Sequence, residues 1–289
     1  MALYNVNGDV IQTSGAGAAD FGVTDYAIYT DGDGSARQAT LTYQGKRLYP
    51  RNYPEQRKET IKQYGGGVML TLGDSYTTYM NSFFAAFAAK HGLVQDNRGL
   101  VSSTIAGSAD GTTVGYHAFW TRLDAAVDEY AATGGYTIDG TAYAADDVKL
   151  ITFMGGANDW TTVDASSDID RIGSPTSTDK EQLYGACKYI FDKLLESFPK
   201  ADIVVILQPC SEAKGNYAMW LKEGVVRSMA EMYSLPICDC CFEWYNPSNP
   251  DDNAAYWQTD KLHLTTAGHQ AIIDKLERVV NNLPFSRAN

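Results

Sequence analysis

A serine, a histidine and an aspartate that could together cleave an ester occur in two short motifs near opposite ends of the sequence. Gly73-Asp74-Ser75 follows an apolar run, and Asp260 precedes His263 by three positions. A histidine can take the proton of a serine hydroxyl and later return it to a leaving group, while a carboxylate on its other nitrogen fixes the tautomer. This chemistry requires a fold that brings the two motifs together.

A third motif, Gly156-Ala157-Asn158-Asp159, follows another apolar run. The amide of Asn158 could donate a hydrogen bond to the oxygen that becomes negative during ester cleavage. Each motif is also typical of an ordinary turn or helix cap. We expect Asp74 and Asp159 to brace their loops through hydrogen bonds rather than to take part in the chemistry.

The segments between these motifs predict an α/β domain. Four short, apolar and partly β-branched runs are predicted strands: residues 68–72, 150–154, 203–207 and 236–240. Five segments have apolar residues at helical spacing and are predicted helices: residues 78–91, 117–131, 183–198, 217–233 and 267–280. Their alternation favours a parallel sheet with helices on both faces.

Capping signals refine two of these helices. Thr178 and Glu181 have the spacing of a capping box ahead of the third helix. Thr265 or Thr266 is the expected N-cap of the last helix. The serine and asparagine motifs both follow predicted strands, at the sheet edge where open parallel sheets bind their ligands.

In this order and spacing, the three motifs resemble the conserved blocks of the SGNH or GDSL hydrolase family. The resemblance covers residues 68–282 and implies a flavodoxin-like, three-layer α/β/α fold with a central parallel sheet. It also implies a serine esterase that works through an acyl-enzyme and needs no cofactor. Within that class we expect short-chain or acetyl esters of carbohydrates as substrates.

The resemblance assigns roles to particular residues. Ser75 would be the nucleophile, His263 the general base and then acid, and Asp260 the residue that orients the histidine. The oxyanion hole would consist of the backbone N–H groups of Ser75 and Gly107 and the side chain of Asn158. Gly99 and Gly111 are alternatives to Gly107.

Two aromatic residues next to the motifs are candidates for substrate binding. Tyr76 stands where the family often has leucine or isoleucine, and Trp160 follows the asparagine motif. Packing is the alternative role for both. The other three histidines, His91, His117 and His269, lack a neighbouring carboxylate at a strand end, so we do not expect them to act as the base.

Residues 1–66 differ from the rest of the chain and predict a β-rich extension, followed by a hydrolase domain at 67–289. Short alternating runs flank Asn7-Gly8 and Gln44-Gly45, as in tight hairpins. The three glycines at 65–67 suggest either a hinge between the two parts or a close approach of the backbone at the first strand.

Composition limits the possible partners. The net charge of −12 disfavours binding to nucleic acid or to an anionic membrane. No apolar stretch is long enough to span a bilayer, and no secretion signal is visible, so we expect a soluble protein. The cytoplasm is one compatible compartment, and both the compartment and the oligomeric state stay open. The expected partner is a small-molecule or carbohydrate ester.

The cysteines favour packing over metal binding. They are odd in number and lack the paired spacing of a zinc site, so we expect buried, reduced thiols and no metal: Cys187, Cys210, Cys238, Cys240 and Cys241. Two other functions stay open. The extension could make this a carbohydrate- or surface-binding protein with an accessory hydrolase domain, or the same residues could transfer the acyl group to an alcohol.

Overall fold

The computed structural model describes residues 61–107, 117–159, 171–211, 213, 216–241 and 255–283, together with the backbone of five short strands within residues 3–48. Contacts divide the chain into two units, Met1–Glu59 and Thr60–Asn289. Within the described residues, no helix is both long and apolar enough to cross a membrane.

The first unit contains antiparallel strands, as the sequence predicts. β1 (Leu3–Tyr4) pairs with β2 (Val10–Gln12), and β3 (Val23–Thr30) pairs with β4 (Ala36–Tyr43), which pairs with β5 (Lys46–Leu48). Asn7-Gly8 falls between β1 and β2, and Gln44-Gly45 between β4 and β5, which agrees with the hairpins expected there.

The second unit is built on a five-stranded parallel sheet in the order β12-β11-β10-β6-β7. Its strands are β6 (Val68–Gly73), β7 (Val94–Gly99), β10 (Val148–Met154), β11 (Asp202–Leu207) and β12 (Ile237–Asp239). The chain runs from β6 outward to β7 and then returns to the other side of β6. The point where the order reverses therefore lies between β6 and β10, where doubly wound folds place their ligand sites.

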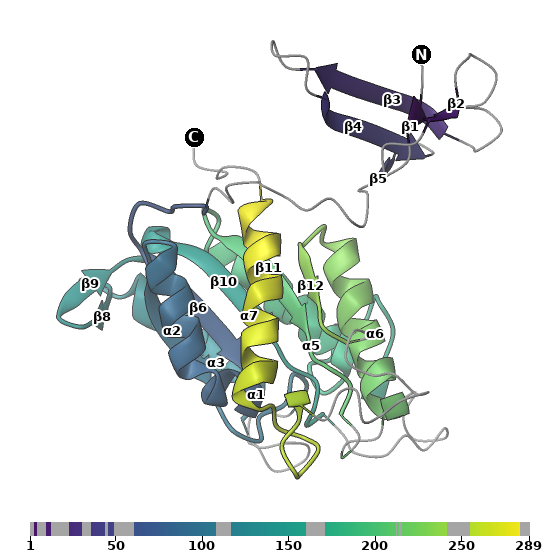
Figure 1. Ribbon diagram of the computed structural model, residues 1–289. Helices are drawn as coiled ribbons and strands as arrows, with labels where there is room; N and C mark the ends of the chain where they lie inside the picture. The colour runs from purple at the N-terminus through teal and green to yellow at the C-terminus, as the bar shows by residue number, and fades with distance from the viewer. Residues whose placement is uncertain are drawn as a thin grey trace. The chain divides into compact units, whose positions relative to one another are not determined.

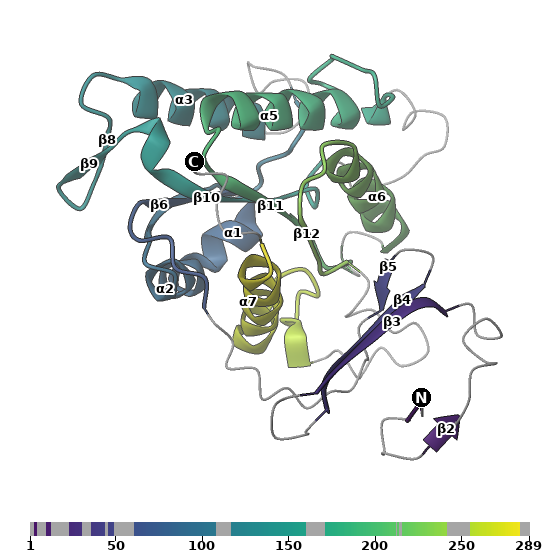
Figure 2. The same ribbon diagram turned by 90° about the horizontal axis from the view of Figure 1, so that it is seen from above.

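Helices cover both faces of this sheet (Figures 1 and 2). One face carries α2 (Asn81–Lys90) and α7 (Thr266–Asn281), and the other carries α3 (Phe119–Ala131) and α5 (Leu183–Ser197). α6 (Asn216–Met232) packs against α5 and β11. The three-layer α/β/α prediction is confirmed.

Several boundaries differ from the sequence prediction. The helix expected at 78–91 is two helices, α1 (Ser75–Tyr79) and α2, which meet at Met80. α5 begins at Leu183 with Gln182 as its N-cap, so the capping box of Thr178 and Glu181 is not formed. Thr265 is the N-cap of α7, as predicted, and its side chain accepts a hydrogen bond from the Gly268 N–H at 3.3 Å.

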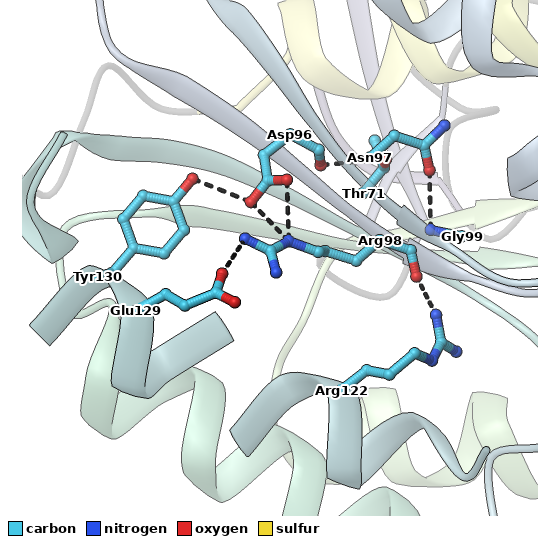
Figure 3. Close-up of polar contacts among 8 residues, drawn as sticks. All are labelled: Thr71, Asp96, Asn97, Arg98, Gly99, Arg122, Glu129 and Tyr130. Atoms are coloured by element: carbon cyan, nitrogen blue, oxygen red, sulfur yellow. Dashed lines mark hydrogen bonds and ion pairs between the residues drawn. The ribbon is translucent and has the colours of Figure 1, made fainter. Parts of the chain in front are cut away.

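Strand β7 and the hairpin of β8 (Tyr136–Ile138) and β9 (Thr141–Tyr143) are absent from the sequence prediction. The β7 sequence, VQDNRG, contains charged residues that normally argue against a strand. The fold accommodates them in a polar cluster between β7 and α3 (Figure 3). Arg98 pairs with Asp96 at 2.8 Å and with Glu129 at 2.6 Å, and the Tyr130 hydroxyl donates to Asp96 at 3.0 Å.

The boundary between the two units lies before the glycines at 65–67. Lys62 is buried, pairs with Asp202 at 2.5 Å and donates its backbone N–H to Asn281 at 2.9 Å, so this part of the predicted extension belongs with the sheet. A Cβ on Gly67 would lie 2.4 Å from the Asp147 carbonyl. That glycine therefore serves a close approach of two backbones inside the second unit rather than a hinge between units.

Candidate active site

Ser75 is the first residue of α1 and stands two residues after Gly73, the last residue of β6. The preceding residue, Asp74, is the N-cap, and its carboxylate accepts a hydrogen bond from the Tyr76 N–H at 2.9 Å. An acidic N-cap stabilises a helix start by about 1 kcal/mol, and the first N–H groups of the helix have no acceptor within it. The turn therefore presents the serine hydroxyl next to backbone donors at the carboxyl end of the sheet.

Ser75, His263 and Asp260 form a continuous chain of hydrogen-bonding contacts. The distance from Ser75 Oγ to His263 Nε2 is 3.3 Å, and that from His263 Nδ1 to Asp260 Oδ2 is 2.7 Å. The segment before α7 thus reaches the same end of the sheet as α1, although the two are far apart in the sequence (Figure 1). The structure brings together the three residues that the sequence singled out.

Asp260 is held by the turn that it shares with His263. Its Oδ1 accepts hydrogen bonds from the backbone N–H groups of Leu262 and His263, both at 2.9 Å. Desolvation pushes the pKa of Asp260 upward, but hydrogen bonds from the His263 and Leu262 N–H groups outweigh it and lower the pKa to about 2. Asp260 is therefore ionised at neutral pH and can stabilise a protonated imidazole.

The other histidines are placed elsewhere. His91 is buried with its Nδ1 at 2.7 Å from the Lys62 carbonyl, and burial lowers its pKa. His269 lies in α7 with its ring 5.3 Å from that of Phe83. His117 is exposed at the start of the segment leading to α3.

Asn158 follows β10 and lies over the loop that follows β7. Its Nδ2 donates to the Ser103 carbonyl at 3.1 Å, which orients the amide. The neighbouring Asp159 is buried and accepts the N–H groups of Ile105 and Ala106 at 3.0 and 2.8 Å. Burial raises the pKa of Asp159 to about 6, although these two donors oppose the change. The bracing roles predicted for Asp74 and Asp159 are confirmed by these contacts.

Arg122 connects the ends of β6 and β7 to the loop that follows β7, which contains Ser103. From α3, its guanidinium donates to the Gly73 carbonyl at 3.0 Å, to Ser103 Oγ at 2.9 Å and to the Arg98 carbonyl. The last of these contacts is drawn in Figure 3. Burial lowers the pKa of Arg122 to about 10, so it remains a cation beside the serine turn.

Gly107 already has a hydrogen-bond acceptor for its N–H, the Lys180 carbonyl at 3.0 Å. Ser102 is linked to Asn158 more directly than Gly107 is. It directly precedes Ser103, whose carbonyl accepts the hydrogen bond from the Asn158 amide. It is exposed, has a φ of 63° and finds no acceptor for its N–H among the described residues. Of the other glycines considered, Gly99 lies in β7, and Gly111 falls outside the described residues.

Tyr76 does not line a cleft. Its side chain is 1% exposed, and its hydroxyl donates to the Leu262 carbonyl at 2.5 Å. The expectation that Tyr76 binds substrate is therefore corrected: it ties the serine turn to the histidine segment. Trp160, the other candidate, lies outside the described residues.

Tyr79 is an aromatic residue at the site that the sequence prediction missed. It is 48% exposed, and its ring lies 4.8 Å from that of His263 in an edge-to-face arrangement. The signal was available in the sequence, because residues i and i+4 share one face of a helix and Tyr79 stands four residues after Ser75.

The five cysteines are free and buried, as expected. Cys210 and Cys241 place their sulfur atoms 3.0 Å apart beyond the ends of β11 and β12. Within the part of the chain that the structure describes, no group of three or more histidine, cysteine or acidic residues could hold a metal ion.

Comparison with known proteins agrees with this geometry. Residues 71–271 match the model of the GDSL-like lipase/acylhydrolase family, and the chain belongs to that family. None of the curated proteins matches the sequence.

Several solved structures are similar to this chain at low sequence identity. A protein from Lactobacillus plantarum is 21% identical with a TM-score of 0.54, and the match covers 75% of this chain and 95% of the other. A lipase/acylhydrolase from Enterococcus faecalis is 14% identical with a TM-score of 0.47, covering 74% and 95%. The acetylxylan esterase Axe2 from Geobacillus stearothermophilus is 17% identical with a TM-score of 0.45, covering 79% and 99%.

Proposed function

We propose that this acylhydrolase cleaves carboxylic esters through an acyl-enzyme formed on Ser75. The observation that carries the proposal is the contact chain from Ser75 Oγ through the His263 ring to the Asp260 carboxylate. Because Asp260 is ionised, it accepts a hydrogen bond from the Nδ1–H group, which leaves Nε2 with its lone pair toward the serine. His263 Nε2 then takes the hydroxyl proton as Oγ attacks the ester carbonyl.

His263 relays one proton in each half of the reaction: the serine proton passes to the leaving alcohol, and a proton taken from water later returns to Ser75 Oγ. His263 gives the serine proton to the leaving alcohol when the tetrahedral intermediate collapses, which frees the alcohol and leaves the acyl group on Ser75. A water molecule next loses a proton to His263 and attacks the acyl-enzyme, which releases the acid and restores the serine. The proposal uses only residues of this chain and no cofactor.

The negative oxygen of the intermediate needs preorganised donors. We assign the backbone N–H of Ser75, at the start of α1, and the side-chain amide of Asn158. For a third donor the Ser102 N–H is better supported than that of Gly107, because the Gly107 N–H donates to the Lys180 carbonyl.

Tyr79 supports a substrate with a carbohydrate or aryl alcohol. His263 must reach the leaving oxygen, so the alcohol binds beside the histidine ring, where Tyr79 is half exposed. An aromatic surface there suits the apolar face of a sugar or an aryl group. Short-chain or acetyl esters of carbohydrates are thus the substrates that we propose.

The first experiment is labelling with a fluorophosphonate, which reacts with activated serines. We expect a single adduct on Ser75 that is absent from Ser75→Ala. No labelling of the folded wild type would contradict the proposal and favour a binding protein with an inactive domain.

A second experiment would identify the substrate. Turnover of p-nitrophenyl esters of rising chain length and then of acetylated oligosaccharides fixes the acyl and alcohol preferences. Product analysis with an added alcohol acceptor distinguishes hydrolysis from acyl transfer.

A further inference from the structure

The side chain of Gln208 connects the serine turn to the asparagine loop. Gln208 follows β11 and is fully buried. Its Nε2 donates to Asp74 Oδ2 at 2.8 Å, and its Oε1 accepts the Ala157 N–H at 2.8 Å. One amide group therefore holds the residue before the nucleophile and the residue before Asn158.

This connection crosses a strand. β10 lies between β11 and β6 in the sheet, so the Gln208 side chain must pass beyond the end of β10 to reach Asp74. Gly156, beside Ala157, leaves room for the Glu223 carboxylate. It has a φ of 132°, and a Cβ on it would lie 2.7 Å from Glu223 Oε1 and 3.9 Å from Gln208 Oε1.

Gln208 is itself held in place. Its backbone N–H donates to Glu223 Oε2 at 3.0 Å, and Glu223, on α6, is buried. The neighbouring Lys222 is also buried, with its Nζ 3.4 Å from the Ala157 carbonyl. α6 thus holds the Gln208 backbone and the Ala157 carbonyl, while the side-chain amide is held by the two loops.

An amide meets both demands at this position, whereas an ionised carboxylate does not. Asp74 needs a donor and the Ala157 N–H needs an acceptor, and a glutamine supplies one of each. A carboxylate in its place would face Asp74 with a second negative charge and no proton to donate. The position therefore requires one donor and one acceptor, and not only a side chain of the right size.

We propose that Gln208 is a positioning residue that sets the nucleophile turn at the correct distance from the Asn158 loop. The inference rests on the proposed ester hydrolysis, because it concerns the geometry of Ser75 relative to the oxyanion donor. A displacement of about 1 Å in such a site can cost about a hundredfold in rate.

The informative variant is Gln208→Glu. Charged and titratable groups that surround the position are Asp74 at the start of α1, Lys222 and Glu223 on α6, Asp159 after β10, and Cys210 after β11. Ionised, the new carboxyl repels Asp74. Protonated, it has one O–H donor and one carbonyl acceptor, like the amide that it replaces.

We expect Gln208→Glu to lower kcat by about ten- to a hundredfold at neutral pH with little change in KM. The ratio of variant to wild-type kcat should rise as the pH is lowered, because protonation restores the donor. Gln208→Met, which has a similar shape and no polar group, should lose kcat by a constant factor at every pH. Each kcat is divided by the folded fraction measured by circular dichroism.

Gln270→Glu is the matched control. Gln270 also donates its amide to an aspartate, Asp274 at 2.8 Å, but on the exposed surface of α7. The kcat of Gln270→Glu should equal that of the wild type across the pH range.

Two outcomes would overturn the positioning role. One is a kcat ratio for Gln208→Glu that does not change with pH, and the other is a loss of thermal stability in both Gln208 variants with full kcat in the folded fraction. Labelling of wild-type Ser75 by fluorophosphonate tests the proposed function separately. If fluorophosphonate labels the wild type and the Gln208 variants keep the wild-type kcat, the positioning role is rejected and the proposed function stands.

Discussion

The serine turn and the histidine segment are positioned by different kinds of interaction. The serine turn is buried, and strand ends, Gln208 and Arg122 hold it. The histidine segment is held mainly by its own backbone, and the Asp260 side chain is 46% exposed. A buried network couples the position of a residue to the stability of the fold, whereas a local turn can support chemistry with little effect on stability.

Removal of the nucleophile should have the largest effect on activity. Ser75→Ala is expected to lower kcat by about a millionfold, because only binding and the oxyanion donors remain. Steady-state hydrolysis of p-nitrophenyl acetate measures the loss. Turnover close to that of the wild type in the folded variant would reject Ser75 as the nucleophile.

Asp260→Asn should separate activity from stability. We expect kcat to fall by about ten-thousandfold, because the amide favours the wrong histidine tautomer, while Tm hardly changes. Because the pKa of Asp260 is lowered from 3.8 to about 2, its contribution to stability is present above pH 3.8 and lost as the pH falls toward 2. Any difference in Tm between variant and wild type should therefore shrink as the pH falls through about 2.

The matched change in the serine turn is Asp74→Asn. For Asp74→Asn we expect lower kcat together with lower Tm. The Asp74 carboxylate accepts hydrogen bonds from the Tyr76 N–H and the Gln208 amide inside the core. If both aspartate variants changed Tm equally, the contrast between the two regions would be wrong.

Asn158→Ala should lower kcat by about a hundred- to a thousandfold with little change in KM, as is typical when an oxyanion donor is lost. If Asn158 instead only braces its loop, Tm falls and the folded fraction retains full kcat. Thermal melts recorded beside the kinetics distinguish the two results.

Tyr76→Phe tests the direct link between the two regions. The change removes the hydrogen bond from the phenol to the Leu262 carbonyl and keeps the packing of the ring. We expect a loss of about 1 kcal/mol in unfolding free energy and a loss of only a few-fold in kcat. A loss as large as that of Asp260→Asn would mean that the phenol, rather than the local turn, positions His263.

Deletion of the first unit should have the smallest effect on kcat. A chain lacking residues 1–59 is expected to keep the kcat of the wild type on small esters. Removal of residues 1–66 also removes Lys62 and leaves the partly buried Asp202 without this cation, so we expect this protein to be the less stable of the two. Chemical denaturation of the two truncated proteins compares them, and equal stability would contradict the boundary after Glu59.

The sequence predicts the strands and site residues that are marked by patterns of neighbouring residues. Strands β6, β10 and β11 are apolar and were predicted, whereas β7 was not, because its Asp96 and Arg98 are compatible with a strand only through partners on α3. The motifs around Ser75, Asn158 and His263 could be read directly. The role of Gln208 could not, since it depends on which strand ends lie side by side.

The turn that contains Asp260 and His263 also has a consequence for how the protein can change over evolution. Four consecutive residues encode both the base and its carboxylate, and their own N–H groups set the geometry. An insertion or deletion between β12 and this turn does not separate the pair. The histidine and aspartate can therefore be inherited or lost as one unit, whereas the nucleophile must change in step with residues from several strands.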